Sequence, residues 1–265
     1  MIDNQIVIIG TGRVATHLAA RLQTLGGDVR QILGRNRDKT QKIASQFVNC
    51  DAIFVPSKIL RTANYYIVAV SDDAIAQVAA SLAMYLPETA LILHTSGSVA
   101  STVFAAYFKN YGVLYPLQSF SPETAPDWQT LPICIHANNE LKINDLRGFA
   151  TQLSPKVFTI DDKQRASLHV AAVFANNFTN HLFAIAETIC IKEQVPFDIL
   201  RPLIAETARK VQHISPVLAQ TGPALRGDAA TMQRHIEYLQ KYNDSVLYEL
   251  YKLISENIIR KNTAN

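Results

Sequence analysis

Apolar and polar positions follow two different patterns along the chain, and the change falls near residue 160. Before it, short apolar runs alternate with stretches whose apolar positions recur at helical spacing. Such alternation predicts a parallel sheet covered by helices. The expected strands are 5–9, 29–33, 66–70, 90–94, 112–115, 133–136 and 156–160, and the expected helices are 13–25, 38–47, 73–85 and 99–109. Pro56 breaks any helix over 52–64, where we expect a short edge strand and a loop.

From residue 161 onward the pattern is helical. Residues 163–193 carry apolar positions at helical spacing, with no glycine or proline to stop the helix. A helix of that length, about 45 Å, is too long to cap a small sheet and indicates an all-helical domain. Further helices are expected over 197–215, 229–240 and 243–259. The predicted fold class is α/β: a doubly wound, mostly parallel sheet over 1–160, then a helical domain over 161–265.

The first predicted strand ends in a glycine turn, Gly10-Thr11-Gly12-Arg13-Val14-Ala15, which matches G-x-G-x-x-A between a strand and a helix. Gly10 permits the tight turn, and Gly12 lets a pyrophosphate approach the backbone. The helix N-terminus offers free N–H groups and partial positive charge to phosphates. We therefore expect a Rossmann-like dinucleotide site contacted by Gly10, Thr11, Gly12, Arg13 and Val14.

The second strand ends in basic residues, Gly34-Arg35-Asn36-Arg37. Folds that bind NAD place an acidic residue there to hold the ribose 2′-hydroxyl. A guanidinium would instead pair with the 2′-phosphate of NADP. Both arginines could also be solvated charges at the start of a helix. The pattern favours NADP over NAD, with Arg35, Asn36 and Arg37 as cofactor-binding residues.

Polar residues also follow the next two strands, at the edge where ligands bind in open α/β sheets. Val70 and Ser71 are expected to flank the cofactor, and Ser71 is also a good helix N-cap. After the fourth strand come His94, Thr95 and Ser96. His94 and Thr95 are expected beside the cofactor, and His94 or Ser96 could face the nicotinamide. The hydroxyls could alternatively cap the next helix, and the sequence lacks the G-x-S-x-G of a hydrolase.

Three later segments offer substrate contacts. Gln118 and Ser119 follow the next strand, where an ordinary loop is the competing interpretation. In the long helix, His169, Asn176 and Asn180 share one face, with Asn177 and His181 beside it. Polar groups in such an apolar stretch need partners, which either a substrate pocket or an interhelical network would supply. Arg226, after a glycine-proline turn, could clamp an anion or pair with Asp228, which would cap the next helix.

Composition excludes several classes of protein. The net charge is only +3 and there is no basic block typical of nucleic-acid binding. Cys50, Cys134 and Cys190 are scattered, so neither a zinc site nor a disulfide framework is indicated, and a reducing cytoplasm is favoured. His169 and His181 lie about 18 Å apart along a helix and cannot share a metal. We expect no signal peptide and no membrane span.

Taken together, the motifs resemble a known bacterial family. They are G-T-G-R-V-A, A-V-S-D-D-A-I, H-T-S-G-S, Y-P-L-Q-S-F, L-H-V-A-A-V-F-A-N-N-F-T-N-H-L and T-G-P-A-L-R-G-D. The family joins a Rossmann-like domain to a C-terminal helical domain of uncharacterised function, and its members are assigned as NADP oxidoreductases of the deazaflavin-dependent type. The architecture is remotely similar to pyrroline-5-carboxylate reductase, prephenate dehydrogenase and the β-hydroxyacid dehydrogenases. That likeness implies a helical domain that forms a homodimer and completes the active site.

Two departures separate this chain from its remote relatives. The β-hydroxyacid enzymes carry a catalytic lysine shortly before an Asn-Asn pair, but here Ala172, Val173 and Phe174 precede Asn176 and Asn177. Prephenate dehydrogenases have a histidine where Tyr115 precedes Pro116. Both mechanisms therefore transfer poorly.

The resulting hypothesis is an NADP-dependent reductase of a small C=O or C=N compound. His169 is the first candidate for proton donor and His94 the second, because imidazole titrates near neutrality. Asn177 and Ser96 would hydrogen-bond the developing charge. Substrate contacts are assigned to Gln118, Ser119, Asn176, Asn180 and Arg226. The alternatives are an NADP-binding sensor without turnover, which the missing lysine favours, and an enzyme that uses a reduced deazaflavin to reduce NADP.

Overall fold

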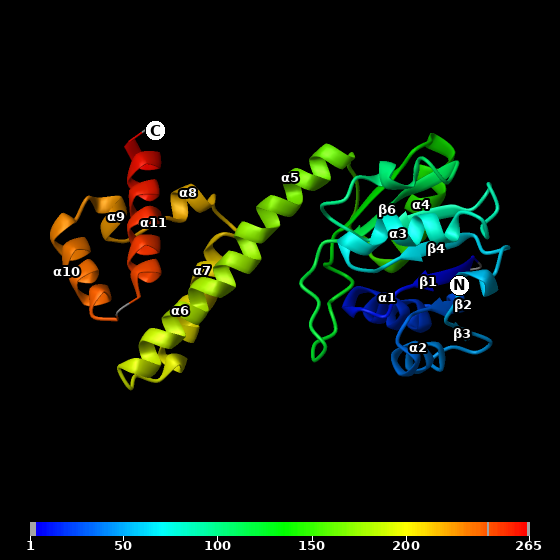
Figure 1. Cartoon of the computed structure of the whole chain (residues 1–265). Coiled ribbons are helices and arrows are strands. Elements are labelled where there is room, and N and C mark those ends of the chain that lie inside the picture. Colours follow the sequence, from blue (N-terminus) through cyan, green and yellow to red (C-terminus); the bar gives the residue numbers. More distant parts are fainter. Residues whose placement is uncertain (1–3, 243, 264–265) are drawn as a thin grey trace. The chain divides into compact units, whose positions relative to one another are not determined.

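The computed structural model describes residues 4–242 and 244–263 and contains two compact units, Met1–Leu182 and Phe183–Asn265. The first unit is built on one eight-stranded sheet with the order β3-β2-β1-β4-β5-β6-β7-β8. Figure 1 shows this sheet with helices packed along it. Its strands are β1 (Gln5–Ile9), β2 (Asp28–Leu33), β3 (Asp51–Ile53), β4 (Tyr65–Val68), β5 (Leu91–His94), β6 (Asn110–Pro116), β7 (Ile133–Ala137) and β8 (Val157–Thr159). The first six strands follow the dinucleotide-binding order 3-2-1-4-5-6. All neighbours pair in parallel except β6 and β7.

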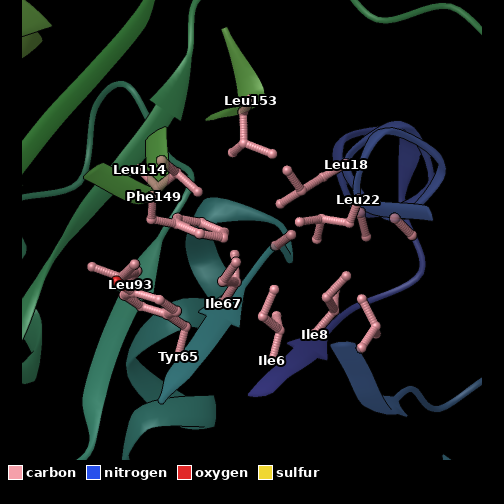
Figure 2. Packing of buried hydrophobic residues seen from close by; sticks show 14 of the residues in the cluster. Ile6, Ile8, Leu18, Leu22, Tyr65, Ile67, Leu93, Leu114, Phe149 and Leu153 are labelled. Atoms are coloured by element: carbon pink, nitrogen blue, oxygen red, sulfur yellow. The ribbon is translucent and has the colours of Figure 1, made fainter. Parts of the chain in front are cut away.

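Helices cover both faces of this sheet. They are α1 (Arg13–Thr24), α2 (Arg37–Ala44), α3 (Asp72–Leu82) and α4 (Glu140–Leu153), with short 3₁₀ turns η1 (Pro56–Lys58) and η2 (Ser101–Phe104). Figure 2 shows the core on one face, where Leu18 and Leu22 of α1 and Phe149 of α4 pack on Ile8 and Ile67. The other face buries α3 and η2 against alternate residues of the same strands. The predicted doubly wound, mostly parallel sheet is therefore confirmed.

Two segments differ from the sequence-based expectation. The helix predicted over 99–109 was wrong: that segment forms only η2, because β-branched and aromatic residues dominate it and are weak helix formers. Helix α4 was not foreseen, although Leu146, Phe149, Ala150 and Leu153 are buried at helical spacing and Asn139 caps its N-terminus. Its apolar face packs on the sheet at β7, the strand that runs antiparallel to β6.

The long predicted helix is present as three consecutive segments. They are α5 (Asp162–Ala172), a π-helical segment η3 (Val173–Phe178) and α6 (Thr179–Lys192). A capping box starts α5, with Asp161 accepting from the backbone of Gln164 and the Gln164 side chain accepting from the backbone of Asp161. The division between the compact units falls inside α6. The functional boundary expected after residue 160 remains a prediction.

The second unit is helical. After α6 come η4 (Phe197–Leu200), α7 (Arg201–Lys210), α8 (Pro216–Ala219), α9 (Pro223–Arg226), α10 (Ala229–Gln240) and α11 (Ser245–Thr263). The helix expected over 197–215 ends earlier, at Lys210, whereas α10 has the predicted bounds. No helix in the described part of the chain is long and apolar enough to cross a bilayer.

Candidate functional site

A cleft of about 790 Å³ opens at the carboxyl ends of β1, β2 and β4. That volume is in the range of about 300–1,000 Å³ found for ligand and cofactor sites. The lining residues come from the turns after these strands, from α3 and from the segment after β3. They are Ile9, Gly10, Thr11, Gly12, Arg13, Val14, Leu33, Gly34, Arg35, Asn36, Phe54, Pro56, Ala69, Val70, Ser71, Ala74, Gln77, Val78, Ser81 and Thr95.

The glycine turn forms the floor of the cleft. Gly10 has a φ of 122°, and a Cβ there would lie 2.1 Å from the carbonyl oxygen of Ala69, so only glycine fits. Gly12 is the N-cap of α1, and a Cβ built on it would meet nothing within 4 Å. No side chain caps α1. The N-terminus of α1 thus presents unpaired amides to open space, as phosphate binding requires.

Two arginines line the cleft, one at the start of α1 and one after β2. Arg13 and Arg35 line it and are exposed, and no carboxylate in the described residues forms a salt bridge with either. No acidic side chain of the described chain lines the cleft. Asn36 caps α2 by accepting from the backbone of Lys39 at 2.9 Å. This basic rim fits a ligand with several phosphates.

An aromatic wall, which the sequence did not single out, completes that side. Phe54 and Pro56 follow β3 and line the cleft. The guanidinium of Arg37 lies 4.6 Å from the centre of the Phe54 ring, on which it stacks. Arg37 itself is not a lining residue, so of the predicted basic pair Arg35 is the one at the cleft. The sequence signal that could have identified Phe54 is an aromatic residue that follows a predicted edge strand and precedes Pro56.

The opposite side of the cleft carries Val70, Ser71 and Thr95, as expected. Ser71 occupies the N-cap position of α3, but its hydroxyl makes no capping hydrogen bond. The hydroxyl of Ser96, by contrast, accepts from the amides of Ser98 and Val99, both at 3.1 Å. The geometry thus favours the capping interpretation for Ser96.

His94 ends β5 with no exposed surface. Its Nδ1 accepts from the amide of Ser96 at 3.2 Å. Burial, and to a smaller extent the guanidinium of Arg165, lowers the pKa of His94 to about 4, although the carboxylates of Asp162 and Asp72 act in the opposite direction. The imidazole is therefore neutral at neutral pH, which favours a structural role over that of a proton donor.

Three distant segments meet beside this edge. The phenol oxygen of Tyr115, at the end of β6, lies 3.2 Å from Nδ1 of His169 in α5. Gly97 packs on both side chains: a Cβ there would lie 2.6 Å from Nδ1 of His169 and 2.8 Å from Cζ of Tyr115. Tyr115 was missed as a functional residue. The signal was a polar group ending an apolar strand at the ligand-binding edge, directly before Pro116.

A buried ion pair fixes the start of α5 at this edge. The Arg165 side chain is 1% exposed, donates from Nη1 to Oδ1 of Asp162 at 2.7 Å, and donates from Nη2 to the carbonyl oxygen of Val99. Oδ2 of Asp162 accepts from both the amide and the hydroxyl of Ser101 at 2.9 Å. Although burial alone would raise the pKa of Asp162, these hydrogen bonds hold it below its usual value. His169, one turn later, is positioned by this clamp.

The remaining predicted residues are not gathered in the cleft. Asn176, Asn177 and Asn180 are exposed on the long helix, and the first two lie in its π-helical segment. Gln118 and Ser119 are exposed, and the Gln118 side chain accepts from the amide of Ser119.

Arg226 belongs to the second unit, where it is exposed at the end of α9. Asp228 caps α10, as the sequence suggested, by accepting from the amide of Thr231 at 3.0 Å. No group of three or more His, Cys, Asp or Glu residues within 4–242 and 244–263 could hold a metal ion.

Comparisons with known proteins divide the chain in a similar way. The family model described as "NADP oxidoreductase coenzyme F420-dependent" matches residues 5–97, and the model "Domain of unknown function (DUF2520)" matches 131–258. A search of curated proteins found no match. A crystal structure from Bacteroides fragilis, of a protein provisionally assigned as an NADP oxidoreductase, is 37% identical, with 97% of this chain and 98% of that chain covered and a TM-score of 0.89.

More distant structures share the fold. A reductive aminase from Aspergillus terreus, in complex with NADPH and ethyl-5-oxohexanoate, is 16% identical, with 97% of this chain and 94% of that one covered and a TM-score of 0.72. A pyrroline-5-carboxylate reductase from Coxiella burnetii is 15% identical, with 98% of each chain covered and a TM-score of 0.61.

Proposed function

Since the chain belongs to the family of the Bacteroides fragilis protein, we propose that it is an NADP-dependent oxidoreductase that transfers hydride to or from a small carbonyl or imine compound. The observation that carries the proposal is the cleft over the glycine turn, with its free helix N-terminus, its basic rim and its lack of a lining acid in the described residues. A nicotinamide cofactor bound there supplies the hydride. The fold-level likeness to imine-reducing and aminating enzymes suggests the substrate class.

The chain's own residues would divide the work by position. The amides after Gly12 would hold the pyrophosphate, while Arg35, with Arg37 and Asn36 beside it, would bind the 2′-phosphate. Val70, Ser71 and Thr95 would bound the cofactor toward β5. Two residues after Thr95, Gly97 packs against the side chains of Tyr115 and His169. We place the reacting carbon there, with His169 in the proton transfer.

The helical part supports a homodimer. Val170, Phe174, Phe178 and Leu182 recur every four residues along α5, η3 and α6 and are 57%, 62%, 49% and 41% exposed. Four large apolar side chains in one stripe are rarely left in water. A second copy of the chain is the occupant we propose. Free Cys50, Cys134 and Cys190 are consistent with a cytoplasmic protein.

A second candidate function follows from the description of the matching family model. That family is described as dependent on coenzyme F420, so the chain could pass hydride between a deazaflavin and NADP. Reduction of NADP by reduced F420, with no turnover of any carbonyl or imine, would support this candidate over the first. Tight NADP binding with neither activity would instead support a sensor.

Calorimetry on three proteins tests the cofactor assignment. Wild type should bind NADPH more tightly than NADH. Arg35→Ser with Arg37→Ser should lose about 10- to 100-fold in NADPH affinity and leave NADH unchanged, because hydrogen bonds to charged groups contribute about 1.5–3 kcal/mol. Gly12→Val, whose side chain would enter the cleft, should lose both nucleotides and keep its circular dichroism spectrum.

Equal wild-type affinity for NADH and NADPH would contradict the role of the arginines. No heat from either nucleotide would overturn the whole proposal. With binding established, NADPH oxidation in the presence of a panel of small ketones, aldehydes and cyclic imines identifies the substrate class.

A further inference from the structure

The Tyr115–His169 pair has a chemistry that neither family model assigns. We propose that the phenol of Tyr115 is the group that gives a proton to the substrate, and that His169 resupplies it. The inference rests on the proposed function, because it needs a reduction at this end of the cleft. It adds Tyr115 to the reacting groups and changes the task of His169 from direct donor to relay.

The backbone holds the phenol at the right edge of the sheet. Tyr115 is near the carboxyl end of β6, and its neighbour β5 continues into Thr95, which lines the cofactor cleft. Two residues after Thr95, Gly97 lies against the phenol ring, and any side chain there would displace it. The three residues Thr95–Gly97 therefore run from the wall of the cleft to the phenol ring of Tyr115.

Packing gives the phenol one orientation. Tyr115 is 9% exposed and packs with Val113 and Cys134, and Leu168 of α5 covers this small cluster. Its ring meets the His169 ring edge-on, with centroids 6.2 Å apart and planes at 68°. His169 is only partly buried, so it can exchange protons with water. A buried donor backed by a half-buried imidazole that can pass on a proton is the arrangement expected of a relay.

The charges around the phenol keep it protonated. Burial raises the pKa of Tyr115; Cys134 and Asp72 act in the same direction, and Arg165 acts against them. These groups face it from β7, α3 and α5, together with His169 itself. At neutral pH Tyr115 is thus a hydroxyl that can donate, and the nearby Arg165 guanidinium would favour the phenolate formed for a moment after transfer.

The step balances for a carbonyl substrate. The substrate carbon gains a hydride from NADPH and becomes C–H, and the former carbonyl oxygen takes the Tyr115 proton as the phenolic O–H bond breaks. The phenolate then takes the Nδ1 proton of a protonated His169, which leaves a neutral imidazole. Water later restores that proton. One carbonyl, one NADPH and one proton give one alcohol and one NADP.

Tyr115→Phe tests the donor directly, because it removes one oxygen and keeps the ring. On a ketone that the wild type reduces, kcat should fall about 100- to 10,000-fold, the usual contribution of a positioned acid. NADPH affinity by calorimetry should be unchanged. Tyr111→Phe is the matched control, at the far end of the same strand, and should keep the wild-type rate.

His169→Gln tests the relay. It should lower kcat less than Tyr115→Phe does, because the phenol that gives the proton to the substrate is kept. A readout independent of turnover comes from ¹⁵N-histidine NMR. The tautomer ratio of His169 should change in Tyr115→Phe, because the hydrogen bond at Nδ1 helps to fix it, and should not change in Tyr111→Phe.

Each outcome separates this inference from the proposed function. Wild-type kcat in Tyr115→Phe, with NADPH still bound and oxidised, would overturn the inference and leave the reductase intact. An unchanged His169 tautomer ratio in Tyr115→Phe would also overturn it, whether or not a substrate is known. Failure of the wild type to bind NADPH would remove the proposed function instead.

Discussion

At the scale of the residue, position within a strand decides what a polar side chain can do. His94 is the last residue of β5 and Tyr115 the last but one of β6, at the same edge of the sheet. The sequence identified His94 as a candidate because it interrupts an apolar run, but it could not show that the imidazole would be fully enclosed and hydrogen-bonded to the next turn. Tyr115 was overlooked because tyrosine is common in strands. Its role depends on partners from residues 97 and 169, which no local pattern reveals.

The enclosed imidazole of His94 makes folding stability depend on pH. The pKa is 6.5 for an unperturbed histidine and about 4 for His94 in the fold, so between these values the unfolded chain binds a proton that the folded chain does not. Stability is fully present above pH 6.5 and falls as the pH decreases toward 4, by a total on the order of 3 kcal/mol.

Urea unfolding from pH 7.5 to 4.5 measures this effect. In His94→Asn the amide oxygen can still accept from Ser96 but cannot titrate. The stability advantage of wild type over this variant should shrink by about 1.4 kcal/mol per pH unit below pH 6. A constant difference across the range would mean that His94 titrates equally in both states.

At the scale of the element, the sequence predicted the strands and the long helix well and the connections less well. Strong periodicity was enough for β1, α1 and α10. The segment after β5 has helical spacing as well, yet it forms only η2, and its carbonyl at Val99 accepts instead from Arg165, 66 residues away. Such a long-range bond cannot be read from a local window, and it determines where α5 begins relative to the sheet.

The clamp between α5 and the sheet should be costly to break. Arg165→Met leaves the partly buried Asp162 beside Ser101 without its cation and the carbonyl of Val99 without its donor, and we expect a loss on the order of 1–3 kcal/mol in the free energy of unfolding. Amide exchange in the first turns of α5 should speed up. Arg147→Met, on the exposed face of α4, is the control and should change stability by less than about 1 kcal/mol.

A second variant separates charge from shape. Asp162→Asn keeps the shape and can still accept from Ser101, but it leaves the 1% exposed Arg165 guanidinium without an anion, so its stability should fall at least as far as that of Arg165→Met. If Arg165→Met were as stable as wild type, the ion pair would not be what holds α5 in place.

At the scale of the whole molecule, the exposed apolar stripe on the long helix needs a cover. The helical spacing of Val170, Phe174, Phe178 and Leu182 was visible in the sequence. Spacing alone cannot identify the partner, because a helix face looks the same whether it meets another helix of its own chain or a second copy. The homodimer therefore came from resemblance, and it stays a prediction.

Size-exclusion chromatography coupled to light scattering measures the oligomeric state. The wild-type protein should have about twice the chain mass of 29.4 kDa. Phe174→Asp, which places a charge in the stripe, should have the mass of a monomer. Its Tyr115–His169 contact should be unchanged. Leu141→Asp, at a 79% exposed position on α4, should stay dimeric. A wild-type mass of one chain would contradict the assembly.

The π-helical segment has a consequence for protein engineering. Backbone bonds there run from each residue to the fifth along, and the Thr179 hydroxyl likewise reaches back to the carbonyl of Phe174. Such a turn holds an additional residue, and one residue in an α-helix corresponds to about 100° of rotation. Consider a lysine introduced before Asn176 at a position chosen by sequence alignment with an enzyme whose corresponding helix is a regular α-helix. Its side chain would point about a quarter of a turn away from the intended direction. Positions for catalytic residues introduced into this helix must therefore be chosen from its actual geometry, counting residues from the start of α5.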